Sequence, residues 1–472
     1  MTEPVPASRS GAILKFANNI LTARVRMFGA AGWVAVAFIL QQFVRLGSSI
    51  LLASLLAPAL LGTMLLINTL RTGVELLSDV GIGQNIINNP RGNEPEFYNT
   101  AWTIQILRGV VLTVLALALS IPVAQIYDNA DLKVLLPFVA PVFLIAGLMS
   151  PSRFLLQKRM EVGKVATFDL VLGVFAAAVQ VALVAYSATI ESLIWGLIIS
   201  TAIWTIGSFF IIDWRGHKLQ WDMGAAKSIL HFGKWIFLST LIYFLAMNFD
   251  RLYFADAIPI ALLGIYGIAR TFSETVTLLF QHMGNSFVFP KISASGLRGA
   301  DLRKSIGPIR MVILLVIATG LAFGISVADE FIFLVYDARY HAAGFFLTVL
   351  LFGTWFSTLG TMSDAMMMGV GKPSGVALSN GVKLTIIAAL LPFVLANYGI
   401  NAALLVFVFA EVARYAALMW QKRNHGIGFA RQDVIATAVF IILVFAFREM
   451  TMLVGLTGGI SEWIAQASTS HV

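Results

Sequence analysis

The chain of 472 residues contains no cysteine. This absence excludes disulfide bonds, thiolate catalysis and cysteine-based metal sites. The chain also has few charged residues, because Asp, Glu, Lys and Arg make up only 12% of it, whereas a soluble domain carries about 25%. Its six histidines are scattered without the spacing of metal ligands. The composition therefore predicts neither a metal site nor a bound cofactor.

Two segments that would point to secretion or to enzymatic chemistry are also missing. The first residues, MTEPVPASRSGAILKFANNILTARVRMF, lack a compact apolar core with a small-residue cleavage site, unlike a signal peptide. We expect residues 1–28 to be a cytoplasmic basic leader that includes a short amphipathic helix on the membrane surface. The loops expected on the outer side of the membrane are short, and the longest of them are YDNADLK and YDARYHAAG. With no domain there for chemistry, the sequence predicts no catalytic residues and no enzyme.

The chain has long apolar runs instead. Hydrophobic residues make up 58% of it, and the mean hydropathy is +0.85. Helical runs of about 20 residues cross the roughly 30 Å of bilayer hydrocarbon, whereas a membrane β-barrel shows ~10-residue alternating segments. The sequence therefore predicts an all-α polytopic membrane protein with twelve core spans and one or two more at the C-terminus. The predicted spans are residues 30–54, 60–88, 98–125, 132–154, 166–189, 191–212, 229–251, 258–288, 308–334, 343–370, 374–396 and 401–420, followed by an apolar stretch at 434–456.

Basic residues occupy alternate loops. One set of loops contains Arg24, Lys158, Arg215, Lys291, Arg303, Lys372 and Lys422, among others. The intervening loops hold little more than Lys133 and Arg339. Cytoplasmic loops are the ones enriched in Lys and Arg, so this bias predicts a cytoplasmic N-terminus. It also accounts for the net charge of +8 without a nucleic-acid partner.

The core spans divide into two related halves of six. ALLG at 59–62 recurs as ALLG at 261–264, each time after a proline-containing link. Each copy opens a span with a basic residue and an acid four positions later. Parallel repeats of this kind place a substrate site between the halves. The predicted regions are a leader at 1–28, an N-terminal lobe at 29–212, a cytoplasmic connection at 213–228, a C-terminal lobe at 229–420, and extra helix or helices with a tail at 421–472.

Charged residues lie inside these spans, where each costs at least ~2.5–3.5 kcal/mol unless it faces a polar interior or a partner. The cations are Arg45, Arg71, Arg108, Arg270, Lys383 and Arg414, and the acids are Glu75, Asp79, Glu274, Asp364 and Glu411. We interpret the cations as the substrate-binding lining of a cavity, because guanidinium groups bind phosphate bidentately at any depth. The acids would balance them or take up H⁺ or Na⁺ to drive transport. The alternative is that the charges are ion pairs that only hold helices together.

Depth in the membrane predicts some of the pairs. Asp79 and Arg108 fall at similar depth on neighbouring spans, as do Glu75 and Arg45. Pairs four or three residues apart on one helix face are Arg71 with Glu75, Arg270 with Glu274, and Glu411 with Arg414. We expect Asp364 and Lys383 to stand alone on facing spans, and Asp169, Asp250, Arg251 and Asp256 to lie at the membrane interface near span ends.

The segment LLASLLAPALLGTMLLINTLRTGVELLSDVGIGQNII resembles the opening of bacterial polysaccharide transporters. These are the Wzx-type lipid-linked oligosaccharide flippases of the multidrug/oligosaccharidyl-lipid/polysaccharide (MOP) exporter superfamily. LLQKRMEVGKVATFDL at 155–170 is similar to that family's basic loop, and FLAMNFDRLYFADAIPIALLGIYGIARTFSE to its seventh-to-eighth span hairpin. The chain departs from the family pattern at Pro58, Ala59, Ile258 and Pro259, where Gly or acidic residues are commoner.

The resemblance implies two six-helix lobes around a central cavity in the bacterial inner membrane, working by alternating access. It implies a cargo of polyprenyl-pyrophosphate-linked glycan, moved to the outer leaflet for exopolysaccharide, capsule or O-antigen. The implied partners are this glycan, membrane lipids, and the polysaccharide polymerase and chain-length machinery.

Other functions remain open at this stage. A multidrug exporter of the same superfamily usually carries cations, so acids rather than arginines should dominate its cavity. A lipid II flippase also carries a pyrophosphate lipid, but is expected to have more spans. A polysaccharide polymerase or ligase acts in a large outer loop, which this chain lacks. A membrane scaffold leaves the intramembrane arginines unexplained.

Overall fold

The computed structural model describes residues 9–76, 78, 81–211, 216–283, 299–369, 373–424 and 428–458. These residues form α-helices and two short 3₁₀ helices, with no strand among them. The helices are α1 (Arg9–Leu55), α2 (Pro58–Leu76), α3 (Ile82–Asn88), η1 (Pro90–Asn93), α4 (Pro95–Ile126), α5 (Leu132–Val139), α6 (Pro141–Leu148), α7 (Ser152–Lys158), α8 (Val162–Tyr186), α9 (Ile190–Ser208), α10 (Met223–Ala257), α11 (Ile260–Met283), α13 (Gly299–Ser326), α14 (Ala328–Val335), η4 (Ala338–Tyr340), α15 (Ala342–Gly369), α16 (Pro373–Asn424) and α17 (Ala430–Leu453).

A helix covers part or all of every apolar segment predicted from the sequence, which confirms an all-α polytopic membrane protein. Eight of the described helices are long and apolar enough to cross a membrane, or nine if the bent segment 132–158 is one span. The stretch at 434–456 is one of them, as α17. The charge-bearing helices α2, α10 and α11 are not among the eight.

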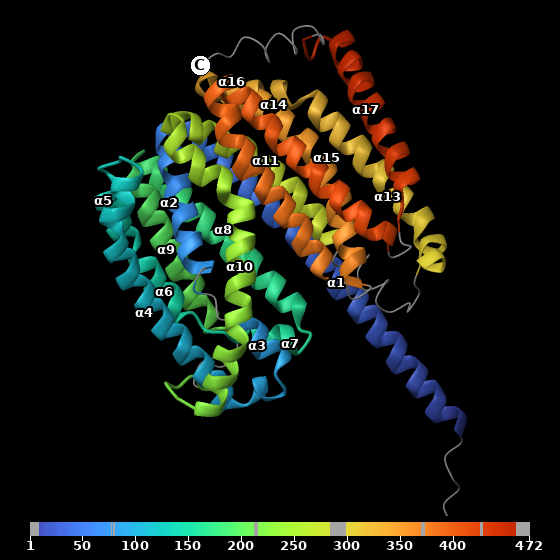
Figure 1. The fold of residues 1–472 in the computed structure, drawn as a ribbon. Helices are drawn as coiled ribbons and strands as arrows, with labels where there is room; N and C mark the ends of the chain where they lie inside the picture. Colours follow the sequence, from blue (N-terminus) through green and yellow to red (C-terminus); the bar gives the residue numbers. More distant parts are fainter. Residues whose placement is uncertain are drawn as a thin grey trace, which may run out of the picture.

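The helices differ from the expected segments in several places. The predicted spans 60–88, 132–154 and 308–334 are each divided between two or more helices. Residues 9–28 belong to the same continuous helix as the first span, α1, rather than to a separate surface helix. In Figure 1 this part of α1 extends away from the other helices. Helix α16 covers two predicted spans and breaks between them at Gly399, whose φ of 76° and ψ of −178° suit glycine.

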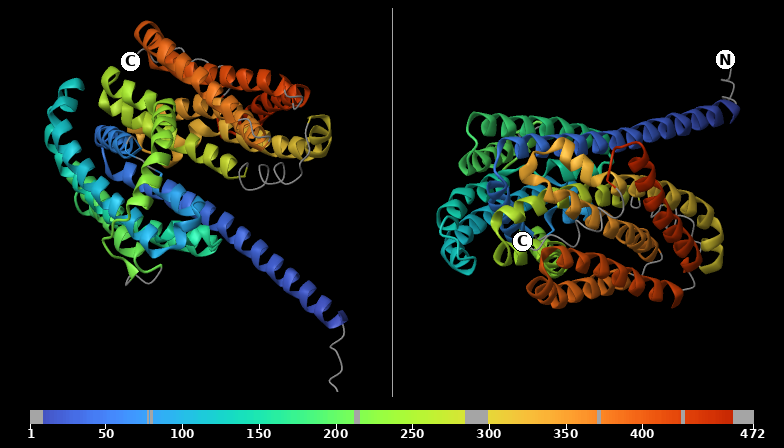
Figure 2. Two further views of the ribbon diagram at one scale, coloured as in Figure 1. Left: turned by 60° about the horizontal axis from the view of Figure 1, so that its bottom comes forward. Right: turned by 90° about the horizontal axis from the view of Figure 1, so that it is seen from above.

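The chain folds into two groups of helices. Figure 1 shows the helices from α2 to α9, coloured blue to green, on one side and those from α11 to α17, coloured yellow to red, on the other. The two further views show the same separation (Figure 2). Helix α10 packs against α2 and α4 of the first group and against α16 of the second.

Helices α2 and α11 meet where the two ALLG copies begin. A Cβ atom on Gly62 would lie 1.9 Å from the carbonyl oxygen of Ile260, and one on Gly264 would lie 2.0 Å from that of Pro58. Each glycine therefore faces the backbone at the start of the other helix in the same way. Such reciprocity is typical of elements related by a two-fold axis, and only glycine permits this approach.

The described part of the predicted connection lies against the first group of helices. The backbone N–H groups of Lys218, Gln220 and Asp222 donate to side chains of α4 at 3.2, 3.1 and 2.9 Å. The first turns of α10 also enter the apolar core of this group, where Ala225 and Ile229 are fully buried. The connection is therefore part of the N-terminal group as far as the start of α10.

Candidate functional site

A charged pocket of about 260 Å³ lies between α10, α11, α15 and α16, and we call it the C-half pocket. Three cations and three acids line it. These are Arg270, Lys383, Arg414, Asp250, Glu274 and Glu411. All of them except Asp250 belong to the predicted set of cavity cations and acids. The fold thus brings residues from spans eight, eleven and twelve together.

The two arms of α16 carry one ion-paired cluster in this pocket. Lys383 Nζ donates to Glu411 Oε1 at 2.6 Å, and Arg414 lies 3.3 Å from the same carboxylate. Arg414 also pairs with Asp364 on α15. Lys383, Glu411 and Arg414 are 7%, 8% and 6% exposed. Asp364 and Lys383 were expected to stand alone, but the break at Gly399 folds the second arm of α16 back and supplies a partner to each.

A second cluster surrounds Glu274 on α11. Its carboxylate lies 3.2 Å from Arg270, 3.8 Å from Arg45 of α1, and pairs with Arg251 of α10. Arg270 is also 3.5 Å from Asp250. Arg45 was expected to pair with Glu75 on depth alone, but it contacts α11 instead.

Asp250 and Arg251 are site residues that the sequence placed at the membrane interface. Helix α10 runs on to Ala257, so both residues lie more than a turn before its end. Asp250 is buried and accepts a hydrogen bond from Tyr266. The adjacent Asp-Arg pair in an otherwise apolar segment was the available signal. The predicted span ended at residue 251, whereas α10 continues to Ala257, so the two residues do not lie at a helix end.

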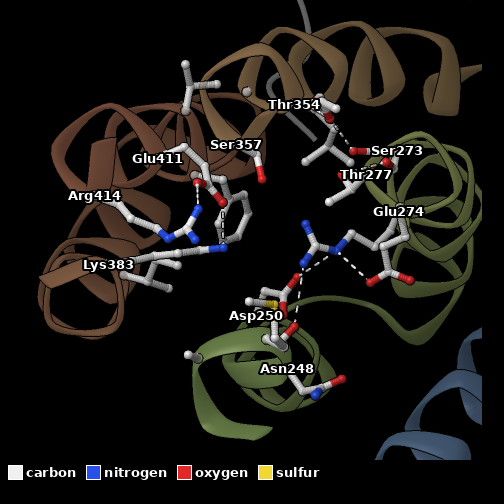
Figure 3. A pocket seen from close by; sticks show the side chains of 18 of the residues that line it. Asn248, Asp250, Ser273, Glu274, Thr277, Thr354, Ser357, Lys383, Glu411 and Arg414 are labelled. Atoms are coloured by element: carbon white, nitrogen blue, oxygen red, sulfur yellow. Dashed lines mark hydrogen bonds and ion pairs between the residues drawn. The ribbon is translucent and has the colours of Figure 1, made fainter. Parts of the chain in front are cut away.

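Neutral polar and apolar side chains complete the lining of the C-half pocket. Ser273 Oγ and Thr354 Oγ1 are hydrogen-bonded at 2.9 Å across α11 and α15. Thr277, Gln281 and Ser357 lie beside them in the lining. Figure 3 shows Ser357 between the charged cluster of α16 and the hydroxyl groups of α11.

A second pocket of about 380 Å³ lies between α2, α4, α6, α7 and α9, and we call it the N-half pocket. It contains the predicted residues Arg71, Glu75 and Arg108, together with Arg153. Arg71 Nη1 donates to Glu75 Oε1 at 2.6 Å, as the spacing on α2 predicted. Arg108 donates to Ser78 Oγ at 2.9 Å and to the Glu75 carbonyl oxygen at 2.5 Å. Asp79, the partner expected for Arg108, lies outside the described residues.

Arg153 falls inside the predicted fourth span, 132–154, next to its end, and the sequence argument did not include it among the cavity cations. It lies on the short helix α7, which is bent by 44° from the segment before it. Its guanidinium pairs with Asp169 of α8 at 3.2 Å. The Nε atoms of Arg153 and Arg71 are buried and have no hydrogen-bond partner among the described residues. Both unsatisfied donors belong to guanidinium groups that line this pocket.

Within the described ranges, no group of three or more His, Asp or Glu side chains is placed so that it could hold a metal ion. The predicted cavity residues thus fall into two pockets, one in each half of the chain. Both combine guanidinium groups with carboxylates between packed helices. The cations outnumber the acid in the N-half pocket, with Arg71, Arg108 and Arg153 against Glu75, whereas the two signs balance in the C-half pocket.

Comparison with known proteins identifies relatives of this chain. The family described as "Polysaccharide biosynthesis protein" matches residues 51–344. The teichuronic acid biosynthesis protein TuaB of Bacillus subtilis is 23% identical over 323 residues, which cover 66% of this chain and 66% of TuaB. The lipopolysaccharide biosynthesis protein WzxC of Escherichia coli is 21% identical over 329 residues, which cover 68% of this chain and 65% of WzxC. The chain thus spans just under two thirds of the length of these relatives.

Solved structures share the fold. The lipid II flippase MurJ in an inward closed conformation has a TM-score of 0.73 at 12% identity, with 92% of this chain and 95% of MurJ covered. An inward-facing multidrug resistance MATE family transporter of the MOP superfamily has a TM-score of 0.62 at 14% identity, with 86% and 98% covered. Because the family match extends over more than half of its length, the chain belongs to the polysaccharide biosynthesis protein family, and its fold is the one shared by these MOP-superfamily structures.

Proposed function

We propose that this chain is a flippase for polyprenyl-pyrophosphate-linked oligosaccharide repeat units. It moves them from the cytoplasmic to the outer leaflet of the bacterial inner membrane, with its N-terminus in the cytoplasm. The product would be exopolysaccharide, capsule or O-antigen, made together with a polymerase and chain-length machinery. The names of the relatives, in teichuronic acid and lipopolysaccharide biosynthesis, support this class of pathway.

The observation that supports an anionic cargo best is the state of the arginines in the N-half pocket. Arg71 and Arg153 each keep a buried Nε–H without a partner among the described residues. A buried unsatisfied donor costs about 1–3 kcal/mol, and a phosphate oxygen that met these groups after the two side chains turn toward the pocket would remove that cost. Guanidinium groups stay protonated at any depth and bind phosphate bidentately. We infer that this pocket receives the pyrophosphate of the cargo.

The architecture that we propose has two six-helix lobes, at 29–212 and 229–420, and twelve core spans. Helices α2, α10 and α11 count as spans despite their charges, because the two pockets and α16 supply partners for those charges. Helix α17 is then a thirteenth span. The reciprocal contact of Gly62 and Gly264 supports a two-fold relation between the lobes. Alternating access would rock one lobe against the other around this axis.

Coupling to H⁺ or Na⁺ remains part of the proposal. The described candidate acids Glu75, Glu274, Asp364 and Glu411 all lie in ion pairs with Arg or Lys. A coupling ion would therefore have to compete with a cation for a carboxylate. We infer that ion uptake and rearrangement of these pairs occur in the same step.

The test is deletion of the gene followed by analysis of polyprenyl-linked glycans and surface polysaccharide. We expect the deletion strain to accumulate lipid-linked oligosaccharide on the cytoplasmic side and to lose surface polymer. Wild type and Arg339→Ala, an exposed outer-loop control, should restore export. Arg71→Ala, Arg153→Ala and Arg270→Ala should not, although each protein reaches the membrane.

Other results would redirect the assignment. Unchanged lipid-linked glycans and surface polymer in the deletion strain would contradict the flippase proposal and make drug-efflux assays the next step. Accumulation of the peptidoglycan precursor lipid II alone would favour a lipid II flippase. Full export by all three arginine variants would contradict the proposal that the two pockets bind the cargo.

A further inference from the structure

The C-half pocket differs from the N-half pocket in its electrostatics. Its three lining cations all lie in ion pairs with lining acids: Arg270 with Glu274 at 3.2 Å, Lys383 with Glu411 at 2.6 Å, and Arg414 with Glu411 at 3.3 Å. Arg414 also pairs with Asp364 outside the lining. The formal charges of the lining residues cancel, three against three. An additional anion would meet carboxylates as well as cations here, so the pocket offers it little net attraction.

The rest of the lining combines uncharged hydrogen-bonding groups with apolar side chains such as Leu350, Ile387 and Phe407. Ser273, Thr277 and Gln281 follow one another at four-residue spacing on α11, and this stripe faces the pocket. Ser273 is engaged with Thr354, and Thr277 donates to the Ser273 carbonyl oxygen at 3.0 Å. The Ser357 hydroxyl and the Gln281 amide form no side-chain hydrogen bond within the described part of the chain. In Figure 3, Ser357 stands at the open centre between the two clusters.

These features together define the chemistry of a ligand. It must be uncharged, because a charged ligand would be repelled by the lining groups of its own sign as much as it is attracted by the others. It must also offer both donors and acceptors, since hydroxyl and amide groups do both while the flanking carboxylates only accept. The volume of about 260 Å³ lies below the roughly 300–1,000 Å³ of pockets for drug-sized ligands. One polyhydroxylated ring meets all three conditions.

We propose that the C-half pocket binds a neutral sugar unit of the cargo, through Thr277, Gln281 and Ser357. This inference rests on the proposed function. The two pockets would bind different parts of the cargo: the N-half pocket binds the pyrophosphate, and the C-half pocket binds a sugar of the glycan. A site whose polar groups are satisfied by a substrate hydroxyl rejects an analogue that lacks it, because the groups are then left unpaired. The three side chains would therefore set glycan specificity without determining whether a pyrophosphate lipid binds.

The experiment measures equilibrium binding of two separate probes to the full-length protein in detergent. The sugar probe is the oligosaccharide released by partial acid hydrolysis of the source cell's surface polysaccharide. The phosphate probe is farnesyl pyrophosphate, which has no sugar. The variants are the double change Thr277→Val with Ser357→Ala, Gln281→Leu, and Arg71→Ala. Thr361→Val, one turn from Ser357 on α15 but outside the pocket lining, is the matched control.

We expect the double variant to weaken binding of the sugar probe about tenfold, the loss of one to two neutral hydrogen bonds, and to leave farnesyl pyrophosphate binding unchanged. Gln281→Leu should act in the same direction. Arg71→Ala should show the opposite pattern, and Thr361→Val should match wild type in both. The melting temperature of each variant verifies that it is folded.

Two results overturn the inference: no binding of the sugar probe by wild type, or equal sugar binding by wild type and the double variant. Sugar binding that is lost in Arg71→Ala to the same extent as in the double variant would also overturn it, because one site would then hold both parts. Failure of the proposed function has a different signature, in which the sugar probe binds and farnesyl pyrophosphate does not.

Discussion

At the scale of single residues, the buried charges of the second half are held by one another. Glu411 accepts from Lys383 and also neutralises Arg414, and all three are almost completely buried. Removal of one member of such a group leaves a charge without compensation, at a cost of about 3–5 kcal/mol. Removal of both members of a pair restores the balance. Exposed pairs contribute only about 0–1 kcal/mol.

We therefore expect Glu411→Gln to lower the melting temperature of the purified protein strongly, since Lys383 loses its only described carboxylate. Adding Lys383→Met should recover most of the loss. Arg339→Gln is the control, because the Arg339–Asp337 pair lies in an exposed loop with the side chains 49% and 40% exposed. Thermal unfolding in one detergent ranks the variants. Equal melting temperatures for Glu411→Gln and Arg339→Gln would show that the buried cluster does not contribute to the thermal stability of the protein.

The same residues show how far sequence reasoning reaches. It identified Arg270, Glu274, Lys383, Glu411 and Arg414 as members of a polar interior, because a charged side chain within an apolar span is costly unless it faces a cavity or a partner. Spacing on one helix predicted the Arg71–Glu75, Arg270–Glu274 and Glu411–Arg414 contacts. Partners on different helices were mostly wrong or missed, because they depend on helix tilt and helix ends, which hydropathy does not define.

At the scale of helices, the contact of α2 with α11 depends on two glycines. Gly62 and Gly264 each face the backbone of the opposite helix, with no room for a Cβ atom. A side chain there must push the helices apart, and overpacking costs typically 1–3 kcal/mol. The effect reaches the pockets, since α2 bears Arg71 and Glu75, and α11 bears Arg270 and Glu274.

Gly62→Ala and Gly264→Ala should each reduce thermal stability and transport. Gly320→Ala on α13 is the matched control, because nothing lies within 4 Å of a Cβ atom there. Alanine should stabilise that helix by up to about 1 kcal/mol. Melting temperature and complementation of the deletion strain are the measurements. A Gly62→Ala protein as stable and active as Gly320→Ala would refute the close contact.

At the scale of the whole molecule, the two groups of helices meet near the loop that contains η4. The Tyr340 hydroxyl donates to the Leu56 carbonyl oxygen at 2.9 Å, and Tyr340 is fully buried. This bond joins the second group to the end of α1. In the proposed orientation it lies on the outer side, so it would have to break before cargo leaves to the outer leaflet.

Tyr340→Phe should shift the population toward an outward-open state. One neutral hydrogen bond contributes about 0.5–1.5 kcal/mol, which predicts a roughly two- to tenfold change in that equilibrium. The absence of native cysteine gives a clean reporter: a single Ser357→Cys in the C-half pocket, labelled from outside the cell with an impermeant maleimide. We expect faster labelling with Tyr340→Phe than without it. Leu334→Cys, at an 88% exposed position, controls for expression, and unchanged Ser357→Cys labelling would argue against the gate.

The sequence by itself determined the all-helical membrane fold, the family and most of the charged residues from which the sites are built. Apolar length, loop charge and intramembrane arginines each follow from the cost of placing polar groups in hydrocarbon, which acts on every segment locally. Only the tertiary structure decided that these residues form two pockets and that Arg251 and Arg153 belong to the charged clusters there. It also decided the partners of Lys383, which pairs with Glu411, and of Asp364, which pairs with Arg414. The pairing of helices depends on close packing, on the break at Gly399 and on the contact of Gly62 with α11. These are interactions between segments far apart in the chain, and no local pattern in the sequence encodes them.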